Sequence, residues 1–295
     1  MVFERFRKKT HSDGPKPSKG AFEQVAEIEG QKLAYLHMGP REKTIVFIHG
    51  NSASKQAFEG QFQAVIDAGY GVLAVDLPGH GGSADAKDPA SRYTIPGYAE
   101  TIATLCAKLG IFSPVLCGWS LGGHIAIEMA AEQPDYSGVM IFGTPPVGPG
   151  MEHIETAFLP SDVGDVTGAE DPPKERLEAY ISALYGTVQS VPEALVQAGF
   201  RTDGRTRSTM FAHWASGVSG HNQRDFVQTW RKPILMLHGA DDAFVPATYF
   251  ESLSVPGDGS GDTFQIIDGV GHAPFLEAPD AFNQKLIDFA QRSFG

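Results

Sequence analysis

One serine in this chain lies in a setting that can turn its hydroxyl into a nucleophile. Ser120 is the centre of the run Gly118-Trp-Ser-Leu-Gly-Gly123, which has the spacing G-x-S-x-G. An apolar segment, 113–117, comes before it, and a segment with helical periodicity, 121–132, follows it. A nucleophilic serine needs a tight strand-to-helix turn, where small neighbours let the backbone close. The sequence therefore predicts nucleophilic catalysis at Ser120.

Such a serine requires a base, and His272 has the most suitable place among the ten histidines. It lies in the loop Asp268-Gly-Val-Gly-His272, between the last predicted strand and the last predicted helix. The base belongs there when the chain order is nucleophile, acid, histidine. The remaining histidines are expected to be structural or solvated.

The acid that orients the base should follow the preceding strand, where two neighbouring carboxylates occur. Asp242, three residues past Gly239, has the position expected for the buried partner of His272. Asp241 is expected to face solvent or to brace the turn. We therefore predict Ser120, Asp242 and His272 as a catalytic triad.

A second loop can supply hydrogen-bond donors to a developing oxyanion. The predicted strand 44–48 ends in His49-Gly-Asn51, and Gly50 has no side chain to keep a substrate from the backbone. The backbone N–H groups of Asn51 and Leu121 are predicted to form the oxyanion hole. Trp119 and Phe58 should lie near the strand ends and are predicted to contact the substrate.

The segments that must position these residues alternate between strand and helix patterns. This alternation predicts an α/β fold with a mostly parallel central sheet, helices on both faces and the site at the carboxyl ends of the strands. Residues 148–230 break the alternation and predict a helical cap, or lid, over the site. The core is then 21–147 and 231–295, after a flexible tail over 1–20. Further strand-like segments are 22–36 with a turn at Glu29-Gly-Gln31, 71–75, 138–142, 233–237 and 263–267, and further helical segments are 95–109, 174–184, 192–198 and 281–294.

Composition excludes some classes of function. The 295 residues are 42% hydrophobic and 20% charged, which suits a globular core, and the net charge is −12. A negative surface disfavours nucleic acid and anionic membranes as partners. No apolar run reaches the length of a membrane span, and the basic start of the chain has no apolar stretch after it. We therefore expect a cytoplasmic protein without membrane insertion. Nothing in the sequence assigns an oligomeric state.

Cysteine and metal-ligand patterns are sparse. Cys106 and Cys117, the two cysteines, lie in apolar runs and are expected to be small buried side chains in a reducing compartment. The sequence has no clustered His/Asp spacing of the kind that binds metal. We therefore expect neither a metal nor a cofactor.

From about residue 22 onward, these motifs resemble the α/β-hydrolase superfamily, and within it the cytoplasmic, metal-independent N-acyl-homoserine lactonases. The resemblance implies cleavage of a lactone or other small ester through an acyl-enzyme. It also implies that Tyr180, which matches a lid tyrosine of that family, hydrogen-bonds the bound lactone. One departure is that Asp242 stands where that family has glutamate. The runs that resemble the superfamily's other loops are Asp76-Leu-Pro-Gly-His-Gly-Gly-Ser83 and Gly239 to Asp242. The runs that resemble the lactonases are His49-Gly-Asn-Ser52, Gly118 to Ile125, Gly143-Thr-Pro-Pro-Val147, Arg201-Thr-Asp-Gly-Arg205, Asn222-Gln-Arg-Asp225 and Gly271-His-Ala-Pro-Phe275.

Other functions share much of this pattern. A general carboxylesterase and a carbon–carbon bond hydrolase acting on dienoic or diketone substrates would use the same triad. Epoxide hydrolases and haloalkane dehalogenases need a carboxylate where Ser120 stands, so they are disfavoured. A ligand-binding receptor on a hydrolase scaffold ranks below these enzymes, and tight ligand binding with very slow turnover would distinguish it.

Overall fold

An eight-stranded sheet runs through the computed structural model, which describes residues 23–218 and 220–295. The predicted tail, 1–20, lies outside the described residues. The order across the sheet is β1-β2-β4-β3-β5-β6-β7-β8. Strand β2 is antiparallel to both of its neighbours, β1 and β4, and the six strands β3 to β8 are parallel to one another. The strands are β1 Gln24–Ile28, β2 Gln31–Met38, β3 Thr44–Ile48, β4 Gly71–Val75, β5 Val115–Trp119, β6 Gly138–Phe142, β7 Ile234–Gly239 and β8 Phe264–Ile267.

The central strands are buried on both faces, which explains their continuous apolar sequences. Every residue of β3, β4, β5 and β6 is buried. Strands of a parallel sheet covered by helices have no solvent face, so apolar residues do not alternate with polar ones. The predicted α/β fold with a mostly parallel sheet is confirmed.

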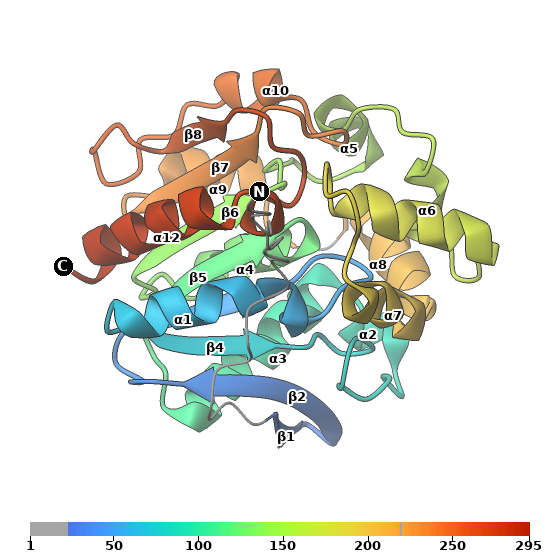
Figure 1. The fold of residues 1–295 in the computed structure, drawn as a ribbon, viewed down its shortest axis with the longest axis horizontal. Coiled ribbons are helices and arrows are strands. Elements are labelled where there is room, and N and C mark those ends of the chain that lie inside the picture. The colour runs from blue at the N-terminus through green and yellow to red at the C-terminus, as the bar shows by residue number, and fades with distance from the viewer. Residues whose placement is uncertain (1–22, 219) are drawn as a thin grey trace, which may run out of the picture.

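Helices cover both faces of the sheet (Figure 1). Helices α1 and α12 pack together on the face nearer the viewer, and α3 and α4 pack together on the opposite face. The helices outside the region between β6 and β7 are η1 Lys55–Phe58, α1 Glu59–Asp67, α2 Pro89–Arg92, α3 Ile95–Leu109, α4 Leu121–Glu132, α10 Ala247–Glu251, α11 Pro274–Glu277 and α12 Pro279–Phe294.

The chain between β6 and β7 forms helices and no strand in its described part. Most of these helices lie beyond the carboxyl ends of the parallel strands, at the right of Figure 1. Helix α9 instead packs against α4. The helices of this region are α5 Met151–Ala157, η2 Gly164–Gly168, α6 Lys174–Leu184, α7 Glu193–Arg201, α8 Arg205–Ala215 and α9 Gln223–Thr229.

The length and apolarity of each helix decide whether it could cross a membrane. Across residues 23–218 and 220–295, none is both long and apolar enough to cross a bilayer.

Candidate active site

Ser120 lies at the turn between β5 and α4, in a backbone conformation that is rare for a residue with a side chain. Its φ is +53° and its ψ is −119°. Its N–H donates to the carbonyl of Phe142 at 2.9 Å, and its carbonyl accepts from the Thr144 hydroxyl at 2.9 Å. Such strain persists only where neighbours hold it, and it is typical of functional sites. The turn thus holds Ser120 rigidly at the end of β5.

Two glycines allow this turn to close. A Cβ at Gly118 would lie 2.3 Å from the carbonyl oxygen of Gly122, and a Cβ at Gly122 would lie 2.0 Å from the carbonyl oxygen of Ile48. Neither distance is compatible with a side chain. The G-x-S-x-G spacing is therefore a steric requirement of this strand, turn and helix.

His272 and Asp242 come from separate loops and meet in the interior. His272 Nδ1 lies 2.9 Å from Asp242 Oδ2, and both side chains are almost fully buried. The other carboxylate oxygen of Asp242 accepts from the backbone N–H groups of Phe244, at 2.8 Å, and Val245, at 3.2 Å. This arrangement fixes the imidazole orientation and favours a proton on Nδ1, which leaves Nε2 to accept one.

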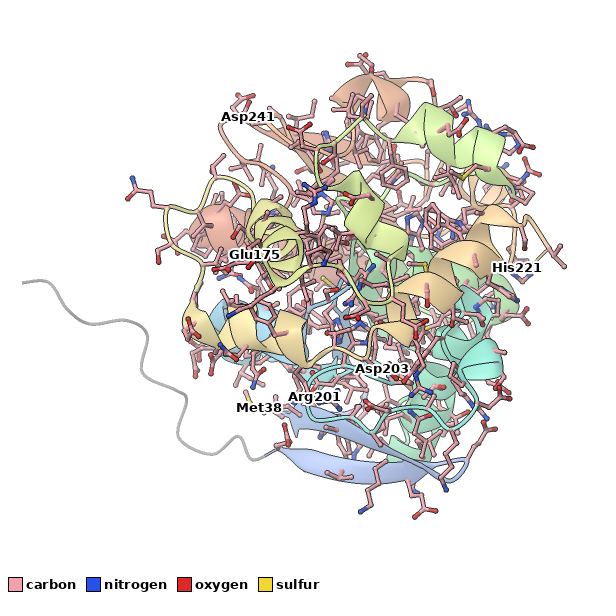
Figure 2. The ribbon with its side chains drawn as sticks, turned by 90° about the vertical axis from the view of Figure 1, so that its right-hand side faces the viewer. Met38, Glu175, Arg201, Asp203, His221 and Asp241 are labelled. Atoms are coloured by element: carbon pink, nitrogen blue, oxygen red, sulfur yellow. The ribbon has the colours of Figure 1, made fainter. Side chains whose placement is uncertain are left out.

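The electrostatics of Asp242 suit that arrangement. Burial alone would raise the pKa of its carboxyl, but the charge and hydrogen bond of His272, with the N–H of Phe244, hold the pKa below its ordinary value. Asp242 is therefore ionised at neutral pH. Its neighbour Asp241 is exposed and lies at the surface (Figure 2), so only Asp242 can orient the imidazole.

The two predicted oxyanion donors are next to Ser120 or one residue from a group that is: Leu121 follows Ser120 in the chain, and a Cβ at Gly50, the residue before Asn51, would lie 3.2 Å from Ser120 Cβ. Asn51 follows β3, Leu121 is the first residue of α4, and both residues are buried. Among the described residues, neither N–H donates a hydrogen bond to another protein group. Buried donors without partners are rare. The lack of protein partners is consistent with the predicted role of these two amides as oxyanion donors.

Ser120 and His272 open into one cavity of about 160 Å³. Most of its walls are apolar and come from the region between β6 and β7. A larger hollow of about 550 Å³ lies between α3 and α4, but no residue of the predicted triad borders it. The smaller cavity is therefore the candidate binding site. Its lining residues are Ser120, Ile154, Phe158, Leu159, Ser161, Gly164, Thr167, Tyr180, Leu184, Phe211, Trp214, Phe244 and His272.

The predicted substrate contacts fall in two different places. Tyr180 lines the cavity, and burial raises the pKa of its hydroxyl to about 12, so the hydroxyl keeps its proton. Trp119 and Phe58 do not border the cavity, which corrects the expectation that they contact the substrate. Both side chains are fully buried and pack against Phe275 in the core. Although both residues lie near strand ends, their side chains point into the core and pack under the residues that line the cavity.

Trp119 has a different connection to the site. Its indole Nε1–H donates to the backbone carbonyl of His272 at 2.8 Å. The residue before the predicted nucleophile thus holds the loop that carries the predicted base.

Glu277 is a further residue of the site that the sequence reasoning missed. Its carboxylate accepts from the N–H groups of Gly271, at 2.8 Å, and Ala273, at 2.9 Å, on either side of His272. It also accepts from the N–H and hydroxyl of Thr187, in the loop after α6. A carboxylate five residues after a loop histidine was the available signal. Glu277 thus ties the histidine loop to the helices over the cavity.

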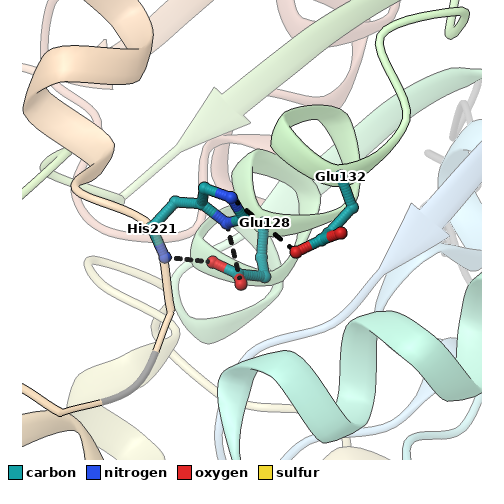
Figure 3. Close-up of side chains that lie close together, drawn as sticks. All are labelled: Glu128, Glu132 and His221. Atoms are coloured by element: carbon teal, nitrogen blue, oxygen red, sulfur yellow. Dashed lines mark hydrogen bonds and ion pairs between the residues drawn. The ribbon is translucent and has the colours of Figure 1, made fainter.

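A second group of titratable side chains lies away from the cavity (Figure 3). Glu128 and Glu132 of α4 meet His221, and their ligand atoms lie within 4.8 Å of one another, so the group could hold a metal ion. The sequence did not indicate this cluster, because its histidine lies far from both glutamates in the chain. The N–H and Nδ1 of His221 lie 2.8 and 3.1 Å from the carboxylate oxygens of buried Glu128. Hydrogen bonding between α4 and the loop before α9 therefore accounts for the arrangement.

Comparison with known proteins extends these observations. Residues 45–285 match the model of the alpha/beta hydrolase family. A non-heme chloroperoxidase of Streptomyces lividans is 27% identical over 90% of this chain and 99% of its own length. A bifunctional esterase/perhydrolase of Acinetobacter calcoaceticus is 27% identical over 75% of this chain and 83% of its own length.

Solved structures show the same relationship at higher identity. A mutant of the N-acyl homoserine lactonase AidH, complexed with N-hexanoyl homoserine, is 36% identical and superposes with a TM-score of 0.86, covering 92% of this chain and 97% of its own. The same lactonase complexed with N-butanoyl homoserine gives a TM-score of 0.84. The chain resembles these lactonases in sequence and structure. The match over most of its length shows that this chain belongs to the α/β-hydrolase family.

Proposed function

We propose that this protein is a serine hydrolase that opens the lactone ring of N-acyl-homoserine lactones, and thereby quenches quorum-sensing signals. The observation that carries the proposal is the shared cavity of Ser120 and His272, with Asp242 hydrogen-bonded to His272 behind it. Ester hydrolysis is supported by the family and by the esterases among its relatives. The lactone substrate is supported by the resemblance to the AidH structures.

The proposed mechanism uses the three residues in sequence. His272 takes the proton of Ser120 as the serine oxygen attacks the lactone carbonyl carbon, and Asp242 stabilises the imidazolium. The amides of Asn51 and Leu121 donate to the oxyanion, and each such donor is worth about 3 kcal/mol in the transition state. The ring C–O bond then breaks, and His272 returns the proton to the leaving alkoxide. Water, deprotonated by His272, attacks the acyl-enzyme, and His272 then gives that proton to the departing Ser120 oxygen as the N-acyl homoserine is released.

A cyclic ester differs from an ordinary ester at one step. The leaving alcohol stays attached to the acyl group, so ring closure competes with attack by water. We therefore expect no early release of alcohol from a lactone in single-turnover experiments. An alkyl ester should release its alcohol before the acid.

The cavity supports a short, apolar acyl chain. Apolar side chains of the region between β6 and β7, such as Phe158, Leu184 and Phe211, form much of its wall. An apolar cavity of about 150 Å³ is known to hold benzene, so a cavity of about 160 Å³, which the lactone ring and the acyl chain must share, favours short chains over long ones. The hydroxyl of Tyr180 is the proposed hydrogen-bond donor to the polar head of the substrate. Residues 148–230 would then act as the lid.

A cytoplasmic location completes the proposal. The supporting observation is that Cys106 and Cys117 are both buried, free thiols. Uncharged N-acyl-homoserine lactones of short chain length could reach an enzyme in that compartment.

The test is to incubate N-hexanoyl-homoserine lactone with the pure protein, with and without a chelator, and to follow ring opening by mass spectrometry. Wild type should give the ring-opened acid at a chelator-insensitive rate, and Ser120→Ala should lower the rate at least about 10⁴-fold. Asp241→Asn is the matched control, because this carboxylate is exposed, and it should keep the wild-type rate.

Two other outcomes would be decisive. Cleavage of p-nitrophenyl butanoate that depends on Ser120, without ring opening, would establish a general esterase and refute the lactone assignment. Tight lactone binding without turnover of either compound would establish a receptor instead.

A further inference from the structure

Arg207, on α8, is a buried cation without a carboxylate partner among the described residues. Only 2% of its surface is exposed. Its guanidinium donates to three neutral oxygens: the carbonyls of Ala169, at 2.8 Å, and Glu170, at 3.1 Å, and the hydroxyl of Ser52, at 3.2 Å. Burial lowers the pKa of Arg207 from its ordinary value, which reflects the cost of a desolvated charge. A side chain buried at that cost requires a compensating role.

The contact with Ser52 leads to the proposed oxyanion hole. Ser52 accepts from Arg207, and its hydroxyl hydrogen donates to the side-chain carbonyl of Asn51 at 3.1 Å. Asn51 in turn donates its side-chain amide to the carbonyl of Thr167, which lines the cavity, at 3.3 Å. Hydrogen bonds therefore connect Arg207 through Ser52 to the side chain of Asn51, and Asn51 to Thr167. Asn51 is the residue whose backbone N–H would bind the oxyanion.

The backbone of this loop also needs support. Ser52 is fully buried and has a φ of +53°, a left-handed conformation that costs a non-glycine residue free energy. Asn51 and Ser52 belong to the core, whereas Arg207, Ala169 and Glu170 belong to the region between β6 and β7. The guanidinium therefore holds the loop in its strained conformation and fastens it to the helices over the site.

We propose that Arg207 is a positioning residue that sets the Asn51 amide for the oxyanion and keeps a positive charge behind it. This inference rests on the proposed serine-hydrolase function. Because an oxyanion carries charge mainly in the transition state, loss of Arg207 should lower kcat more than it changes KM. Arg207 would also couple the placement of the cap to the competence of the oxyanion hole.

The test compares four single variants and one double variant in the hydrolysis of p-nitrophenyl butanoate. Arg207→Met removes the charge and the hydrogen bonds, and Arg207→Lys keeps the charge. Ser52→Ala removes the hydroxyl that links Arg207 to Asn51 and leaves the guanidinium charge in place. Arg205→Met is the matched control, since Arg205 lies on the same helix but is only half-buried and pairs with Asp203. Urea unfolding of each variant gives the folded fraction, by which kcat is corrected.

The inference predicts a graded result. Corrected kcat should fall about 10- to 50-fold in Arg207→Met and a few-fold in Ser52→Ala, with KM changed less than about threefold. Arg207→Lys should recover part of the loss, and Arg205→Met should match wild type. The rate of Ser120 labelling by a fluorophosphonate, whose phosphoryl oxygen occupies the oxyanion hole, should fall in the same order. The double variant Arg207→Met/Ser52→Ala should lose less than the product of the two single losses.

Wild-type kcat in Arg207→Met, after correction for folding, would overturn the inference alone. So would equal losses in Arg207→Met and Arg205→Met, or strictly multiplicative losses in the double variant. If Ser120→Ala keeps the turnover rate of the wild type, the proposed function is wrong, and this inference falls with it.

Discussion

The free energy of unfolding should fall steeply below neutral pH, because three buried histidines stay neutral in the folded state. Burial lowers the pKa of His49 and of His124 to about 4, and that of His80 to about 3. In the unfolded chain each has a pKa of about 6.5. Between these values the unfolded chain binds more protons than the folded chain. The free energy of unfolding therefore rises with pH across that interval and falls as the pH drops.

The size of the effect follows from the pKa differences. At pH 5 each histidine costs roughly 2 kcal/mol relative to pH 8, so the three cost roughly 6 kcal/mol together. A typical domain has a total stability of about 5–15 kcal/mol. Because the pKa of Asp242 is lowered, this carboxylate stabilises the fold at every pH above its pKa in the unfolded chain, which is near 4. That contribution is lost only at lower pH. The raised pKa of Lys55 contributes stability that is lost only in the alkaline range. Neither changes the expectation between pH 5 and 8.

Urea unfolding followed by tryptophan fluorescence at pH 8, 6.5, 5.5 and 5 measures this dependence. His124→Asn removes one titrating group and should reduce the difference between pH 8 and pH 5 by roughly 2 kcal/mol. His153→Asn is the control, because this histidine is exposed and should leave the difference unchanged. A difference below about 1 kcal/mol, or identical pH profiles for the two variants, would show that the buried histidines do not stay neutral at the expense of stability.

Three further predictions concern single contacts. Asp242→Asn should lower kcat about 10³- to 10⁴-fold with little change in KM, whereas Asp241→Asn should not, and steady-state kinetics decide. Trp119→Phe removes one hydrogen bond to the histidine loop, so we expect a stability loss of about 1–2 kcal/mol in urea and a lower kcat; an unchanged kcat would remove its positioning role. Lys55→Met leaves the buried carboxylate of Asp76 without its ion pair, so the free energy of unfolding should fall by about 3–5 kcal/mol. A loss below about 1 kcal/mol in urea unfolding would contradict this expectation.

The sequence predicted the parts of the fold that local rules govern. Continuous apolar runs identified the buried strands, because strands covered on both faces need no polar positions. The helices 95–109 and 121–132 agree with their predicted bounds. The turn at Ser120 was predictable because a side chain at either flanking glycine would overlap the backbone of nearby residues, so the turn requires glycine there.

Other elements depend on contacts that no local pattern encodes. Helix α1 was not predicted, although its buried residues Phe62 and Val65 pack it on the sheet and against α12. Helices α5, α8 and α9 were likewise not individually predicted, since packing around the cavity and against α4 completes their burial.

The same distinction applies to the site. The carboxyl ends of the strands were the expected place for Ser120, Asp242 and His272, and the structure brings all three there. Trp119 and Phe58 were misplaced because nearness to a strand end does not decide which side of the sheet a side chain enters. The roles of Glu277 and Arg207 depend on hydrogen bonds to residues 90 and 155 positions away. The spacing of Glu277 from His272 was a weak signal in the sequence, whereas the role of Arg207 could be found only in the folded arrangement.

The most direct test of the account is to trap the covalent intermediate. The protein is mixed with N-hexanoyl-homoserine lactone, quenched in acid within milliseconds and analysed by intact mass and peptide mapping. The account predicts an adduct on Ser120 with the mass of the whole lactone, because the ring alcohol stays attached, whereas p-nitrophenyl hexanoate should leave only the hexanoyl group. Ring opening that proceeds without any adduct and continues in Ser120→Ala would contradict it.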